Sequence, residues 1–249
     1  MITIYGREMF TTLEELVDPA YTALLLVDIQ NGFCSPDGYL AKEVADMSML
    51  ELAPSRVKPV LEAARRYGVF VIHIQNTLYP KRVAESGAWL RMVYIRRVMS
   101  YGLKAGVRTE VARKTEEPTV LSLATTLEGT YDWQIVDEVA PQPGEIVVKK
   151  HRSSAFIGTD LDMILRSNGI KSVVSVGVAT EGCVESTARD AQFFDYYSIV
   201  LRDCVGTDSH EIHEAALLVM STRMDVVDSA EVIDVWAKKG AASSTEAET

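Results

Sequence analysis

An acid, a cation and a thiol each stand at the end of a short apolar run in this sequence, at Asp28, Lys150 and Cys183. A cysteine thiolate is a strong nucleophile. A carboxylate can take its proton and later return it to a leaving amine, and a nearby ammonium stabilises the thiolate. Together these groups could hydrolyse an amide through a covalent intermediate.

The stretch around Cys183 also provides for the negative charge that forms during such a reaction. An apolar run from Ser172 turns through Gly177–Thr180, and a helix is expected to open over Glu181–Cys183. The first turn of a helix has free backbone N–H groups and a partial positive charge. These groups would favour the thiolate and hold an oxyanion.

Each of the three residues also has a purely structural interpretation. Cys183 could be a thiol packed beneath a helix, Asp28 could form an Asx turn, and Lys150 could be a solvated strand end. Their common position at the ends of three separate strands favours chemistry over these alternatives.

The elements that must position these residues alternate between strand and helix. Strands are expected at 21–29, 69–75, 145–149, 172–176, 195–201 and 224–228, and helices at 56–67, 89–99, 131–139, 160–167, from 181, and 210–222. Residues 30–55 are expected to form a long loop. The alternation predicts an α/β fold, a doubly wound and mostly parallel sheet with helices on both faces. Sites in such sheets lie beyond the strand carboxyl ends, at the topological switch point.

We expect one domain over residues 1–237, with an insert around 81–130 and a disordered polar tail at 238–249. No apolar run approaches the ~20 residues that span a membrane. No signal peptide is visible, and three cysteines are too few and scattered for a disulfide framework. A cytoplasmic location is therefore expected.

The composition and the motifs of the chain limit which ligands and macromolecules it is expected to bind. The net charge of −10 argues against nucleic acid. The four histidines form no ligand cluster and no glycine-rich phosphate loop is present, so neither a metal nor another cofactor is expected. We expect a small-molecule substrate. Apolar residues within Ala88–Met99, with the resemblance described next, indicate a homo-oligomer, either a dimer or a tetramer.

Three stretches carry a resemblance to a known family: LLLVDIQNGF at 24–33, VVKKHRSSAF at 147–156 and GVATEGCVESTARDA at 177–191. In order and spacing they resemble the isochorismatase-like cysteine hydrolases. The resemblance implies a three-layer, Rossmann-like fold and a triad of Asp28, Lys150 and Cys183.

The resemblance also implies a cis peptide between Val178 and Ala179. That bond would aim the Ala179 N–H into the site, where it would form the oxyanion hole with the N–H of Cys183.

Within this superfamily the chain is most similar to the ureidoacrylate amidohydrolases, through IHIQN at 72–76, 131–150 and CVESTARD at 183–190. It also resembles biuret and triuret hydrolases and N-carbamoylsarcosine amidohydrolases. The likeness implies that Asn76 reaches the substrate, and Phe33 and Tyr39 could wall the pocket. Glu181 departs from the family pattern, where Asn or Asp is usual.

We therefore expect a cofactor-free amidohydrolase that cleaves a C–N bond of a small, ureidoacrylate-like substrate through a covalent intermediate on Cys183. A biuret, triuret or N-carbamoyl amino acid hydrolase is the first alternative. An isochorismatase-type vinyl ether hydrolase, which can work with the aspartate and without the thiol, is the second. A non-catalytic scaffold is the third, although a scaffold has no need of three ionisable groups at strand ends.

Overall fold

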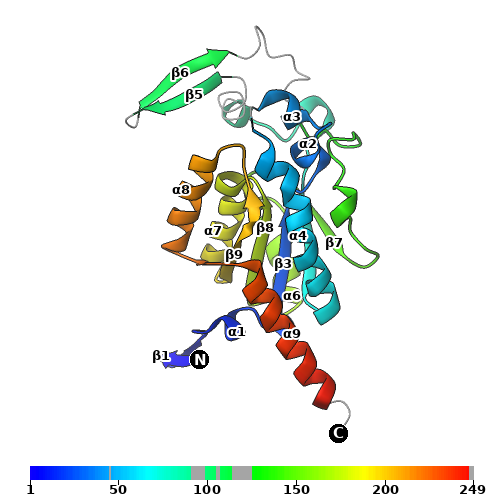
Figure 1. Ribbon diagram of the computed structural model, residues 1–249, viewed down its shortest axis with the longest axis vertical. Helices are drawn as coiled ribbons and strands as arrows, with labels where there is room; N and C mark the ends of the chain where they lie inside the picture. The colour runs from blue at the N-terminus through cyan, green and yellow to red at the C-terminus, as the bar shows by residue number, and fades with distance from the viewer. Residues whose placement is uncertain (45, 91–98, 105–106, 114–124, 247–249) are drawn as a thin grey trace.

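Six strands form the central sheet of this computed structural model, which describes residues 1–44, 46–90, 99–104, 107–113 and 125–246 (Figure 1). Their order is β10-β9-β8-β3-β4-β7, and every neighbouring pair is parallel. The strands are β3 (Thr22–Val27), β4 (Phe70–Asn76), β7 (Ile146–Lys150), β8 (Ser172–Val178), β9 (Tyr197–Gly206) and β10 (Asp225–Val227). The predicted fold class is confirmed.

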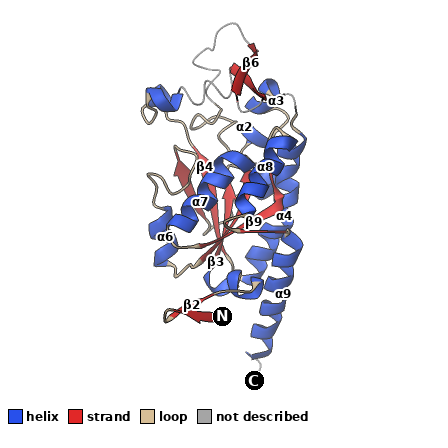
Figure 2. Ribbon diagram, turned by 90° about the vertical axis from the view of Figure 1, so that its left-hand side faces the viewer, coloured by secondary structure: helices blue, strands red, loops and turns tan. Residues whose placement is uncertain are grey.

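Helices cover both faces of this sheet and complete three layers (Figure 2). Successive residues of β3 alternate between the faces, because side chains of a strand point to opposite sides. Leu24 and Leu26 pack in one buried cluster and Leu25 in the other. The first face is covered by α4 (Ser48–Tyr67) and α9 (Ser229–Glu246), and the second by α6 (Leu161–Ser167), α7 (Glu185–Phe193) and α8 (His210–Ser221).

The remaining elements are short. They comprise the antiparallel hairpins β1 (Ile2–Ile4) with β2 (Arg7–Met9) and β5 (Met99–Lys104) with β6 (Val107–Arg113), the helices α1 (Leu13–Leu16), α2 (Asn31–Cys34) and α3 (Tyr39–Glu43), and 3₁₀ turns at Pro19–Tyr21, Pro80–Arg82 and Asp137–Val139. The β5–β6 hairpin stands out from the main body in Figure 1. No helix in the described ranges has the length and apolarity needed to cross a membrane.

Helix α4 differs from expectation, because it begins at Ser48 within the segment predicted as loop. It contains Pro54 and Pro59. A proline inside a helix costs about 3 kcal/mol, so Pro54 argues against a start ahead of it, whereas Pro59 already lies within the helix predicted over 56–67. A buried apolar stripe along α4 offsets this cost. Its residues Leu50 and Ala53, which precede Pro54, are buried in the core cluster on this face of the sheet.

One further prediction is wrong. Residues 131–139 form turns that end in the 3₁₀ turn Asp137–Val139, where a short helix is predicted. Helix α9 continues to Glu246, past residue 238, where the polar tail is predicted to begin. The buried Trp236 anchors it by donating its indole N–H to the Val17 carbonyl, and Lys239 pairs with Asp18 at 2.7 Å. Tertiary contacts thus order a segment whose composition is polar.

Much of the predicted insert falls outside the described residues. The helix expected over 89–99 has its residues 91–98 there, including Met92, Val93 and Ile95, and residues 114–124 of the insert lie there as well. The homo-oligomer expectation, which rested on these apolar residues, stays a prediction.

The strand order locates the switch point of the sheet. From β3 the chain adds β4 and β7 on one side, then returns to add β8, β9 and β10 on the other. Connections therefore reverse direction between β3 and β8. A crevice for ligands is expected at the carboxyl ends of this pair.

Candidate active site

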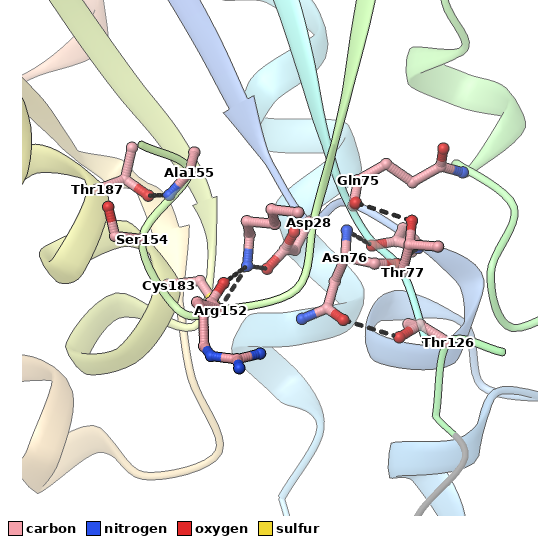
Figure 3. Close-up of polar contacts among 12 residues, drawn as sticks. Asp28, Gln75, Asn76, Thr77, Thr126, Arg152, Ser154, Ala155, Cys183 and Thr187 are labelled. Atoms are coloured by element: carbon pink, nitrogen blue, oxygen red, sulfur yellow. Dashed lines mark hydrogen bonds and ion pairs between the residues drawn. The ribbon is translucent and has the colours of Figure 1, made fainter. Parts of the chain in front are cut away.

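The three residues singled out from the sequence meet at the carboxyl ends of β3, β7 and β8, and Figure 3 labels two of them, Asp28 and Cys183. Lys150 Nζ lies 2.7 Å from Asp28 Oδ2 and 3.2 Å from Cys183 Sγ. It also donates to the Arg152 carbonyl at 3.0 Å. An ammonium has three N–H donors, so these three contacts use all of them. Asp28 and Lys150 are buried, whereas Cys183 is only half-buried and can be reached from outside.

Asp28 lies where the chain leaves β3, in a strained backbone conformation. Its φ is +54°, in the left-handed region that costs a non-glycine residue about 1 kcal/mol or more. Its N–H donates to the Ile74 carbonyl and its carbonyl accepts from the Gln30 N–H. Backbone hydrogen bonds and the ion pair with Lys150 together hold the carboxylate in place.

A close approach between β3 and β8 brings Cys183 to Asp28. A Cβ at Gly177 would lie 2.1 Å from the Val27 carbonyl oxygen, and the residue has a φ of +117°. Only glycine fits there without moving the backbone. Any other residue at 177 would push apart the two strands that present the carboxylate and the thiol.

Cys183 lies in the π-helical turn η5 (Thr180–Val184), which leads into α7. The preceding peptide bond between Val178 and Ala179 is cis. The Ala179 carbonyl accepts the N–H groups of Gly182 and Val184. An oxyanion hole formed by the N–H groups of Ala179 and Cys183 stays a prediction.

Burial and mutual contact shift the pKa values of all three groups. Burial and the Asp28 carboxylate raise the pKa of Cys183 to about 11, despite the opposing effect of Lys150. Burial also raises the pKa of Asp28, although Lys150 and the thiol oppose this rise. Burial alone would lower the pKa of Lys150, but Asp28 and Cys183 raise it above its ordinary value.

Burial and the Asp28 carboxylate thus oppose the thiolate stabilisation that the sequence predicts, while Lys150 favours it. The role of Cys183 as the nucleophile stays a prediction. The arrangement can ionise the thiol at the moment of attack, because the carboxylate beside it accepts a proton.

Asn76 ends β4 and lies between the strands of Asp28 and Lys150 in the sheet. Its side-chain oxygen accepts the Thr126 hydroxyl at 3.0 Å (Figure 3), and over the described ranges its amide N–H groups have no hydrogen-bond acceptor. The buried Gln30 holds its backbone from both sides, accepting the Asn76 N–H at 2.8 Å and donating to its carbonyl at 3.0 Å.

Sequence reasoning missed Gln30 and also His213. The ring Nδ1 of His213 lies 2.9 Å from the hydroxyl of Thr180, within the turn that carries Cys183. The position of Gln30, two residues after Asp28 in the first family-like stretch, was the only available signal for its role. Nothing local in the sequence connects His213 with Thr180.

The other predicted residues are placed as follows. Phe33 is buried in the core cluster under α4, Tyr39 begins α3 and is half-buried, and Glu181 is half-buried in η5. Their roles toward a substrate stay predictions. Over the described ranges, no three His, Cys, Asp or Glu side chains are grouped as metal ligands would be.

Comparison with known proteins matches residues 22–232 to the isochorismatase domain family. A cysteine hydrolase from Pseudomonas syringae pv. phaseolicola 1448A shares 22% identity and a TM-score of 0.71, over 90% of this chain and 96% of that one. An N-carbamoylsarcosine amidase from Thermoplasma acidophilum shares 26% identity and a TM-score of 0.58, over 84% and 96%. A pyrazinamidase from Pyrococcus horikoshii, solved in complex with zinc, shares 25% identity and a TM-score of 0.58, over 84% and 99%.

Proposed function

Since this chain belongs to the isochorismatase family of hydrolases, we propose that it is an amidohydrolase that cleaves a C–N bond of a small ureido or carbamoyl substrate. The observation that carries the proposal is the position of Lys150 Nζ between the Asp28 carboxylate and the Cys183 sulfur. The similarity to an N-carbamoylsarcosine amidase supports a carbamoyl substrate. Ureidoacrylate is our first candidate within that class.

In the first half-reaction Asp28 accepts the proton of the Cys183 thiol as sulfur attacks the ureido carbonyl carbon. Charge on the carbonyl oxygen is stabilised by the N–H groups of Ala179 and Cys183. Asp28 then donates the proton to the leaving nitrogen, the C–N bond breaks, and a carbamoyl thioester remains on Cys183.

In the second half-reaction Asp28 deprotonates a water molecule that attacks the thioester. The C–S bond breaks, carbamate leaves, and the proton on Asp28 returns to the sulfur. Lys150 stays charged throughout and lowers the cost of the thiolate. Asn76 would hold the ureido group through its amide N–H groups, with Phe33 and Tyr39 as proposed pocket walls.

Rapid quenching followed by peptide mass spectrometry tests the covalent step. With ureidoacrylate as substrate we expect a carbamoyl adduct on the Cys183 peptide and none on peptides that carry Cys34 or Cys204. Iodoacetamide should label the same residue and abolish turnover.

Asp28→Asn tests the proton transfers. An amide cannot accept the thiol proton, so we expect kcat to fall by about 10²- to 10⁴-fold. The acid limb of the kcat/KM profile of the unmodified protein should lie above the ordinary carboxyl range, because burial raises the pKa of Asp28. An Asp28→Asn variant that turns over normally, with no adduct on Cys183, would refute the scheme.

A substrate panel separates the remaining alternatives. Ammonia release is measured with ureidoacrylate, biuret, triuret, N-carbamoyl amino acids, simple amides and nicotinamide, and vinyl ether cleavage with isochorismate. Activity on isochorismate alone, retained after alkylation of Cys183, would favour the vinyl ether hydrolase.

A further inference from the structure

We propose that Arg152 binds a carboxylate on the leaving-group side of the substrate, so that the protein selects anionic ureides over neutral ones. This proposal rests on the proposed function and specifies its substrate class. It would separate ureidoacrylate and N-carbamoyl amino acids, which carry a carboxylate, from biuret and triuret, which do not.

The backbone of Arg152 is fixed to the triad. Its carbonyl accepts the third N–H of the Lys150 ammonium at 3.0 Å. In Figure 3 its side chain extends from this point beyond the strand ends, and the amide of Asn76 also lies beyond them. The residue that carries the guanidinium is thus the one whose backbone accepts the third hydrogen bond of the Lys150 ammonium.

The guanidinium is held in one orientation by neutral groups. One Nη donates to the His151 carbonyl at 2.7 Å, and the guanidinium carbon lies 5.1 Å from the centre of the Trp89 ring. Stacking on an aromatic ring leaves the edges of the planar fork free to donate. Both contacts orient the side chain without neutralising it.

The charge of Arg152 lacks a carboxylate partner within the described ranges, although the residue is half-buried. Two other partly buried arginines each have a carboxylate partner: Arg65 pairs with Glu145, and Arg189 pairs with Glu185. Lys150, the other cation of the site, is already paired with Asp28. Among the residues that the structure describes, the positive charge left for a ligand at this edge of the sheet therefore resides on Arg152.

Guanidinium forks match carboxylates with two parallel, charge-assisted hydrogen bonds. A ureide attacked by Cys183 at its carbonyl carbon would direct its nitrogen substituent outward, toward the strand-end region that Arg152 occupies. A carboxylate on that substituent would replace the missing partner. A neutral substituent would leave the guanidinium uncompensated, so the acid is preferred.

Matched substrates test the inference: N-carbamoyl-β-alanine and its methyl ester, assayed with the unmodified protein, Arg152→Gln and Arg166→Gln. For Arg152→Gln we expect kcat/KM for the acid to fall about 10- to 100-fold, mainly through KM, while the ester changes by less than about 3-fold. Arg166, an exposed arginine paired with Asp162 on α6, is the control and should change neither value. Equal losses for acid and ester, or no loss for the acid, would overturn the inference.

Binding measured without turnover keeps the result independent of the proposed chemistry. Calorimetric titration of Cys183→Ala with N-carbamoyl-β-alanine should show binding that weakens about 10- to 100-fold in Cys183→Ala/Arg152→Gln. If the unmodified protein hydrolyses neither compound but this binding difference is found, the proposed reaction fails and the anion site stands. If the acid does not bind to Cys183→Ala, or binds equally to both variants, the anion site fails.

Discussion

Strand β7 has a cluster of charged side chains at each end. The two clusters shift the pKa of their carboxyl groups in opposite directions. At the carboxyl end, the pKa of Asp28 is raised, chiefly by burial. Just before the amino end, Glu145 accepts two hydrogen bonds from Arg65 at 2.7 and 2.9 Å, one from His73 at 2.9 Å and one from the Gln142 N–H at 2.8 Å. Burial alone would raise the pKa of Glu145, but these donors lower it to about 2.

The difference lies in what surrounds each carboxylate. Glu145 is surrounded by donors that favour the charged form, so it stays ionised and binds α4 to the sheet. At Asp28, burial outweighs the opposing effects of Lys150 and the Cys183 thiol, so the charged form is less favoured and proton transfer is accessible. We infer that the Glu145 cluster serves stability and the Asp28 cluster serves chemistry.

The largest expected effect is on turnover, from Cys183→Ser. A serine hydroxyl is a much weaker nucleophile in the same position, so kcat should fall by at least about 10³-fold while the free energy of unfolding changes little. Cys204→Ser is the matched control. Its buried sulfur lies 3.3 Å from the Arg56 carbonyl, far in sequence from the triad, and a hydroxyl can make the same hydrogen bond. Near-normal turnover by the Cys183 variant would contradict the inference that the Asp28 cluster, at the carboxyl end of β7, serves chemistry.

Lys150→Met should affect both rate and stability. It leaves Asp28 buried without its cation, and breaking such a pair costs about 3–5 kcal/mol of unfolding free energy. Turnover should be lost as well, since both Asp28 and Cys183 are held in place by this ammonium.

The neighbouring residue supplies the control for that variant. Lys149 is 43% exposed and pairs with Glu128 at 2.7 Å, so Lys149→Met should change the unfolding free energy by no more than about 0.5 kcal/mol. Chemical denaturation and steady-state kinetics measure both quantities. Similar losses from the two substitutions would mean that burial does not distinguish these lysines.

The smallest effect is expected from Glu145→Gln, and on stability alone. The loss of a charge that accepts from Arg65 should cost about 1–3 kcal/mol of unfolding free energy at pH 7, with kcat unchanged. Because the folded-state pKa lies below its ordinary value of 4.5, this contribution is present above that pH and is lost as the pH falls toward about 2. The difference between the variant and the unmodified protein, measured by denaturation, should therefore shrink between pH 5 and about pH 3. A loss of kcat without a loss of unfolding free energy would contradict the inference that the Glu145 cluster serves stability.

Elements with a strong local signal were predicted correctly, and those that depend on distant contacts were not. The apolar runs of β3, β4 and β8 are continuous, and the glycines after α4 and α6 mark helix ends, so the alternation that defines the fold could be read directly. The early start of α4 could not, because Pro54 argues against a helix that extends ahead of it and that only packing on the sheet stabilises. The extension of α9 likewise depends on contacts of Trp236 and Lys239 with the segment before β3.

The sequence by itself determined which residues stand at strand ends and, through the alternation of strands and helices, that those ends share one edge. Residue identity and strand periodicity are local properties of the chain. Only the tertiary structure decided that Lys150 donates to Asp28, Cys183 and Arg152 at once, and that burial and the Asp28 carboxylate raise the pKa of the Cys183 thiol. Protonation depends on burial and on charges within a few ångströms, and here those charges come from strands that are far apart along the chain.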